Sequence, residues 1–256
     1  MNQGATFPDL SDQHVFITGA ARGLGRSMAE KLARCGATVA VSDIDGAGCD
    51  AVAAGIRAAG GKALAYRVDV AVRDELMLAA GQFSAHCGRI DAMVNNAMLL
   101  RYEPVEKITP ATLDRMTSIG IHGSIWGTQA LLAHYDATRG GAIVNMASPV
   151  AEKGFPNTAA YSLVKGAIVT LTKVLAAELG PRNVRVNAIA PGSVPTPGAL
   201  GLNDPAEYER RARTIPLRRL GHESDNAEAC AFLLSRAASF INGEILHVDG
   251  GIAAAG

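Results

Sequence analysis

Short apolar runs alternate with helical stretches along this chain of 256 residues, and this alternation constrains the fold most strongly. Runs typical of buried strands lie at 14–19, 37–42, 62–68, 90–95, 142–146, 184–189 and 244–248. Helices are expected to about residue 35, in the alanine-rich stretch after residue 43, and over 72–87, 110–135 and about 158–179. The pattern predicts an α/β fold, a parallel sheet with helices on both faces. Without a linker or an internal repeat, residues 1–256 are expected to form one domain.

Composition excludes several classes of function. Lys plus Arg and Asp plus Glu both total 24, so no net field favours nucleic acid or an anionic membrane. The apolar runs are too short to span a bilayer, and residues 1–10 do not resemble a secretory signal. Four widely spaced cysteines indicate reduced thiols, and the six histidines show no metal-site spacing. We therefore expect a cytoplasmic protein without a metal.

Tyr161 and Lys165 are candidates for acid–base chemistry. They are four residues apart at the start of the last long helix, which Asn157 or Thr158 can cap, so their side chains share one face. A nearby ammonium favours the phenolate and lowers the tyrosine pKa towards working pH. Alone, however, this spacing favours an ordinary tyrosine and a solvated lysine.

A glycine-rich turn joins the first strand to the first helix. Gly19, Gly23 and Gly25 allow the main chain to approach a pyrophosphate, which the helix amides would bind. Asp43 ends the second strand, where a carboxylate takes ribose hydroxyls and repels a 2′-phosphate. NAD is therefore favoured over NADP, although Arg22 within the turn is a group that can bind a 2′-phosphate.

Several motifs in order make the chain resemble the short-chain dehydrogenase/reductase family from about residue 11 to residue 251. They are Thr18-Gly-x-x-x-Gly-x-Gly25, Asp69-Val70, Asn95-Asn96-Ala97, Ser148, Tyr161-x-x-x-Lys165, Pro191-Gly192 with Thr196, and Val248-Asp249-Gly250-Gly251. The resemblance implies a Rossmann-like, doubly wound sheet of seven strands in the order 3-2-1-4-5-6-7. The cofactor contacts expected from the turn and the resemblance are Gly19, Arg22, Gly23, Leu24, Gly25, Asp43, Asp69, Val70, Asn95, Ala97, Tyr161, Lys165, Pro191, Gly192, Val194 and Thr196.

The resemblance also implies an activity. The short Tyr-x-x-x-Lys spacing matches the alcohol/ketone branch, whose members transfer hydride between a secondary alcohol and a nicotinamide. Tyr161 would exchange the hydroxyl proton, Lys165 would lower the phenol pKa and grip the nicotinamide ribose, and Ser148 would bind the substrate oxygen. A homotetramer is implied as well, built through the long helices and the C-terminal strand edge.

Two positions depart from the family pattern. Gly120 stands where the family carries a catalytic asparagine, and Met98 stands where glycine usually follows Asn-Asn-Ala. We expect the Gly120 carbonyl to keep a water-linked relay to Lys165, and Gly120→Asn to leave turnover equal or higher. The alternative is an NAD-binding scaffold or sensor with weak catalysis.

The substrate region is less defined by the sequence. Its walls are expected to include Met98, Tyr102, Pro149 and Phe155, below a lid at about 193–215 that orders over substrate. Charged residues of the lid, namely Arg210, Arg211 and Arg213, favour a solvated face, with an anionic substrate as the alternative. A small alcohol or ketone is therefore the expected partner.

Overall fold

The computed structural model describes residues 8–199 and 205–255. Seven strands form one parallel sheet in the order β3-β2-β1-β4-β5-β6-β7, which confirms the predicted fold class and strand order. The strands are β1 (His14–Thr18), β2 (Thr38–Asp43), β3 (Lys62–Arg67), β4 (Ala92–Asn95), β5 (Gly141–Met146), β6 (Val184–Pro191) and β7 (Ile245–Val248). All seven therefore end at the same edge of the sheet.

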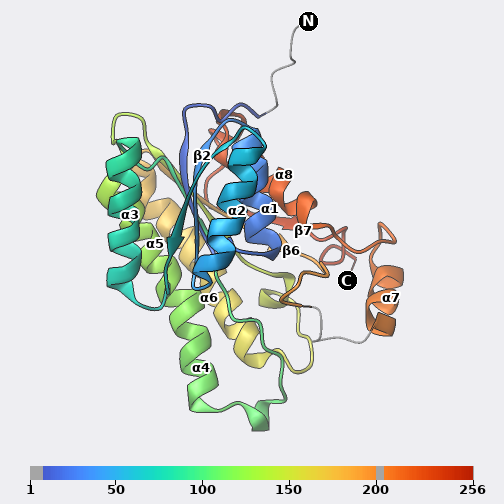
Figure 1. Ribbon diagram of the computed structural model, residues 1–256. Coiled ribbons are helices and arrows are strands. Elements are labelled where there is room, and N and C mark those ends of the chain that lie inside the picture. Colours follow the sequence, from blue (N-terminus) through green and yellow to red (C-terminus); the bar gives the residue numbers. More distant parts are fainter. Residues whose placement is uncertain (1–7, 200–204, 256) are drawn as a thin grey trace, which may run out of the picture.

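Helices cover both faces of this sheet (Figure 1). One core contains residues of α1 (Gly23–Arg34), α2 (Gly46–Ala58) and α8 (Glu223–Leu234) packed on the strands. The opposite core contains residues of α3 (Arg73–Cys87), α5 (Gly123–His134) and α6 (Ala159–Leu179). Strands covered on both faces are largely apolar, as the burial of Val15, Phe16 and Ile17 in β1 illustrates.

The expected helix over 110–135 is divided into three parts. α4 (Pro110–Thr117) leads into a π-helical turn, Ser118–His122, and then into α5. A π turn inserts one residue into the helical repeat, and such turns are frequent at functional sites. Gly120, the position that departs from the family pattern, lies within this turn.

Two further helices follow the last long one. The charged stretch of the lid forms α7 (Pro205–Thr214), which projects from the body of the molecule in Figure 1. α8 had no counterpart in the sequence analysis, because its apolar residues show almost no periodicity. Among residues 8–199 and 205–255, no helix has both the length and the apolar character that crossing a bilayer requires.

Candidate active site

The glycine turn is shaped by close contacts at the carboxyl edge of the sheet. Gly19 and Gly23 have φ of +66° and +58°, a region that favours glycine. A Cβ on Gly25 would overlap the carbonyl oxygen of Gly19, so this position keeps α1 close to β1. Arg22, the N-cap of α1, makes no side-chain cap bond, and the first turn holds no acidic residue. The turn thus has the backbone geometry of an anion cradle.

Three predicted contact residues surround this turn. Asp43 ends β2, and its carboxylate accepts hydrogen bonds from the backbone N–H of Ala21 at 3.2 Å and of Asp45 at 3.1 Å. Ala97 lies against Gly19, since a Cβ there would be 2.8 Å from the Ala97 Cα. The Cβ of Thr196 lies 3.5 Å from the position that a Cβ on Gly23 would occupy. Residues that end or follow β1, β2, β4 and β6 are therefore brought together at the carboxyl edge of the sheet.

Asn96 is a contributor that the sequence analysis left unassigned. Its side-chain amide donates to the carbonyl oxygens of Thr18 and Gly19, both at 2.9 Å. The Thr18 hydroxyl accepts in return from the backbone N–H groups of Asn96 and Ala97. These bonds hold the glycine turn to the end of β4. The sequence signal for this role was a side-chain amide, with two N–H donors, next to a turn whose carbonyl oxygens accept hydrogen bonds.

The side chains of three other predicted cofactor-binding residues form contacts within the protein. The buried Asn95 amide donates to Asn145 Oδ1 at 2.9 Å and to the Ser124 carbonyl at 3.3 Å, so it points into the core. Asp69 forms an ion pair with Arg115 at 2.9 Å. The buried Val70 packs against Gly123. These side-chain contacts help to fix the carboxyl edge of the sheet, independently of any contact that the main chain of the same residues makes.

The remaining predicted cofactor positions line the edge in different ways. Leu24, in α1, is partly buried against the core that contains α1, α2 and α8, whereas Arg22 is exposed. Pro191 pairs with Val248 across β6 and β7, while Gly192 donates its N–H to the Val248 carbonyl at 3.0 Å. Val194 is buried. Part of the predicted lid, residues 200–204, lies outside the described residues.

Ser148, Tyr161 and Lys165 meet beyond the end of β5. Lys165 Nζ lies 5.5 Å from the centroid of the Tyr161 ring and donates to the Met146 carbonyl oxygen at 2.5 Å. The Ser148 hydroxyl accepts from the Val150 N–H at 3.5 Å and lies near enough to the phenol to lower its pKa. The expected convergence of the two head groups is therefore present. Thr158 is the N-cap of α6, but its hydroxyl donates to Phe155 instead of capping the helix, and Asn157 has φ of +64°.

The structure contradicts the predicted lowering of the Tyr161 pKa. Burial raises the phenol pKa above its ordinary value, Tyr102 adds to the rise, and only the Ser148 hydrogen bond acts in the opposite direction. Burial also lowers the pKa of Lys165 to about 8. No carboxylate within residues 8–199 and 205–255 pairs with the ammonium, and its bond is to a carbonyl, so desolvation dominates both groups. The resting phenol is neutral.

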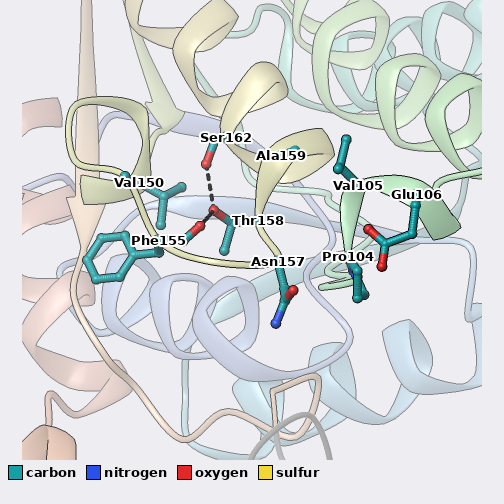
Figure 2. A pocket seen from close by; sticks show the side chains of 10 residues that line it. Pro104, Val105, Glu106, Val150, Phe155, Asn157, Thr158, Ala159 and Ser162 are labelled. Atoms are coloured by element: carbon teal, nitrogen blue, oxygen red, sulfur yellow. Dashed lines mark hydrogen bonds between the residues drawn. The ribbon is translucent and has the colours of Figure 1, made fainter.

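The four expected substrate residues separate into different surroundings. Tyr102 stacks edge-on against Tyr161, with ring centroids 5.7 Å apart and an angle of 71° between the planes. Pro149 is buried directly after Ser148, and Met98 packs beside Gly120. Phe155 instead lines an open pocket of about 480 Å³ with Pro104, Val105 and Asn157 (Figure 2). That pocket contains none of the three candidate catalytic residues.

The lid arginines differ in their ion pairs. Arg210 and Arg211 both bind Glu207, at 2.5 and 2.9 Å, and Arg213 approaches Glu209 at 3.9 Å. Arg210 and Arg213 are mostly exposed, in agreement with a solvated face. Arg211 is the one of the three whose charge acts on Tyr102, lowering the pKa of a phenol that burial raises.

Known proteins match nearly the whole chain. A family model described as enoyl-(acyl carrier protein) reductase covers residues 19–253. Cyclopentanol dehydrogenase of Comamonas sp. is 36% identical over 247 residues, which are 96% of this chain and 98% of the relative. The chain belongs to the short-chain dehydrogenase/reductase family.

Solved structures agree with this assignment. A 7α-hydroxysteroid dehydrogenase complexed with NADH and 7-oxo glycochenodeoxycholic acid has a TM-score of 0.91 at 33% identity and 95% coverage of both chains. A protein of Beutenbergia cavernae with bound NADP at low occupancy has the same TM-score at 33% identity, covering 96% of this chain and 99% of that one. Members of this family bind nicotinamide cofactors, and the chain is an oxidoreductase of that family.

Proposed function

We propose that this protein is an NAD-dependent dehydrogenase that interconverts a secondary alcohol and a ketone, with Tyr161 as the proton-exchanging group. The observation that carries the proposal is the cluster of Ser148, Tyr161 and Lys165 at the same sheet edge as the glycine turn. A relative is named cyclopentanol dehydrogenase, after a cyclic secondary alcohol, which supports this class of substrate.

The turn fits a dinucleotide. The backbone of Gly19 and Gly23 would face the pyrophosphate, and Asp43 would accept from the ribose hydroxyls. A carboxylate there disfavours a 2′-phosphate, which supports NAD over NADP; the exposed Arg22 is the opposing group. When bound, a nicotinamide supplies a hydride acceptor or donor at the substrate carbon.

The protein's own residues would handle the proton. In ketone reduction, the neutral Tyr161 phenol donates a proton to the substrate oxygen while the Ser148 hydroxyl hydrogen-bonds that oxygen. The Lys165 ammonium, held by the Met146 carbonyl, stabilises the phenolate that is left. Alcohol oxidation reverses these steps and requires the phenol to lose its proton first. The raised phenol pKa keeps the proton that ketone reduction requires on Tyr161 at neutral pH.

Tyr161→Phe tests the proposal. With NAD and a panel of secondary alcohols, and NADH with the matching ketones, we expect measurable turnover by the native protein. The variant should retain its fold and lose activity by roughly 10²–10⁴-fold. Full activity of Tyr161→Phe would overturn the assignment of this residue.

The alternative function is an NAD-binding scaffold or sensor with weak catalysis. It is favoured by the departures at Gly120 and Met98, and it predicts that NAD binds while the whole alcohol panel gives no turnover. Calorimetry of NAD binding run beside the activity panel separates the two functions.

We also propose a homotetrameric, cytoplasmic protein. Leu163 and Val174 are 57% and 53% exposed and lie three helical turns apart on α6, so they form an apolar stripe that suits helix packing between subunits. Light scattering after gel filtration tests this: a monomer that retains activity would contradict the proposed assembly.

A further inference from the structure

Gly120 is enclosed by side chains from two other segments. A Cβ placed on this residue would overlap Val164 Cγ1 and would lie 2.9 Å from Met98 Sδ and 3.6 Å from Met98 Cε. Met98 follows β4, and Val164 belongs to α6 directly before Lys165. The volume that a side chain at position 120 would occupy is therefore already filled. This packing opposes the expectation that Gly120→Asn leaves turnover equal or higher, because the asparagine side chain would overlap Val164.

The two neighbours differ in how readily they yield. Val164 is fully buried within α6, and a β-branched side chain in a helix has essentially one favoured rotamer. Met98 is flexible and only partly buried, so its thioether adapts to the gap. Val164 thus excludes a side chain at 120, and Met98 fills the space that remains.

This packed group adjoins the candidate catalytic pair. Met98 and Tyr161 both pack on the buried cluster of Met116, Ala160 and Val164. The Gly120 carbonyl accepts from the Ser124 hydroxyl at 2.7 Å, and Lys165 donates to Met146. Apolar contacts, rather than a side chain at 120, therefore connect the π turn with α6.

We propose that Met98 and Val164 are positioning residues for Tyr161 and Lys165, because their packing into the space left by Gly120 fixes the start of α6 against the π turn. The inference rests on the proposed function of that pair. It makes the glycine and the methionine, which depart separately from the family pattern, one matched arrangement. It also assigns to packing the local order that a polar side chain at 120 would otherwise supply.

A thermal-stability cycle tests the packing without any assay of activity. Gly120→Ala should lower the melting temperature by roughly 5 °C, because overpacking outweighs the higher helix propensity of alanine. Adding Val164→Ala removes the overlapping methyl groups and should recover at least half of that loss. Gly55→Ala in α2 is the matched control, since nothing lies within 4 Å of its Cβ position. An unchanged melting temperature in Gly120→Ala, or no recovery in the double variant, would overturn the packing argument.

Kinetics with the most active secondary alcohol of the panel and NAD, and with its ketone and NADH, test the positioning role. Met98→Ala should lower kcat about tenfold and shift the pH profile of kcat, while Met98→Leu, which conserves volume, should restore kcat to within about twofold. Met77→Ala in α3 is the control, a partly buried methionine of the opposite core that should leave kcat unchanged. Native kcat in Met98→Ala would refute the positioning role while an inactive Tyr161→Phe still supports the proposed function. Full activity in Tyr161→Phe would refute the proposed function itself.

Discussion

Charged side chains form ion pairs at the amino end of the sheet, whereas Lys165 and Tyr161 at its carboxyl end form none within the part of the chain that the structure describes. At the amino end, the segments entering β1, β4 and β5 form a network in which Asp91 contacts Arg89 at 2.7 Å and His14 at 3.2 Å, and Asp12 joins Arg139 at 2.5 Å. At the carboxyl end, Lys165 and Tyr161 are desolvated and neither has an ionic partner among the described contacts. Charges at the first end compensate one another, whereas the Lys165 ammonium at the second has no carboxylate partner among the described residues, although Asp69 and Arg115 are paired at the same edge.

This contrast separates stability from function. Opposite charges that are paired and hydrogen-bonded hold neighbouring strands together, and removing one partner leaves the other uncompensated. A buried lysine without a carboxylate contributes little to stability, because its desolvation opposes folding. Perturbed groups in such surroundings are typical of functional sites. Substitutions at the two ends should therefore affect different measurements.

Lys165→Met is expected to have the largest effect and to confine it to activity. Loss of the ammonium should lower kcat roughly 10³-fold, within the range for acid–base groups. The free energy of unfolding should change by less than about 2 kcal/mol, since relief of desolvation offsets the unpaired Met146 carbonyl. Chemical denaturation and turnover measured on the same preparation check both parts. A variant that unfolds readily would show that Lys165 is structural.

Asp91→Asn is the converse change at the amino end. The carboxylate is 6% exposed and also accepts from the His14 backbone N–H at 2.8 Å. Its neutralisation leaves Arg89 without its main partner and should lower the free energy of unfolding by about 3 kcal/mol. kcat should stay within twofold of the native value at 25 °C. A large fall in kcat with unchanged stability would break the comparison.

The pH profile should report the carboxyl end as well. The pKa of Lys165 is lowered to about 8, so the ammonium is present below that pH and lost above it. The phenol pKa is raised, so Tyr161 remains a proton donor throughout this range. If the ammonium is needed, kcat/KM for ketone reduction should be level from pH 6 to 7.5 and fall about tenfold per pH unit well above 8. A profile that stays level to pH 10 would contradict the role of the charge.

Sequence patterns reached the fold and most of the site because both depend on local signals. Apolar runs predicted the parallel sheet, and the family resemblance implied its strand order. The glycine spacing predicted the turn, and helical spacing placed Tyr161 and Lys165 on one face. The surroundings of Tyr161 and Gly120 could not be predicted from such local patterns. The rise in the phenol pKa depends on burial and on Tyr102, and the exclusion at Gly120 depends on Val164 from a distant helix. The Asn95 amide likewise turns towards β5 because Asn145 accepts from it.

The smallest expected effect distinguishes the rim of the amino-end network from its centre. Arg139 and Asp12 are 39% and 73% exposed, so solvent screens their short contact. Arg139→Gln should lower the free energy of unfolding by less than about 1 kcal/mol, and 1 M NaCl should remove most of that difference. Asp91→Asn should keep most of its effect in the same salt, because Asp91 is buried. Denaturant titrations of both variants at low and high salt make the comparison. Equal salt sensitivity would mean that the network is a surface feature throughout, and its contrast with the desolvated Lys165 would then be one of position rather than of burial.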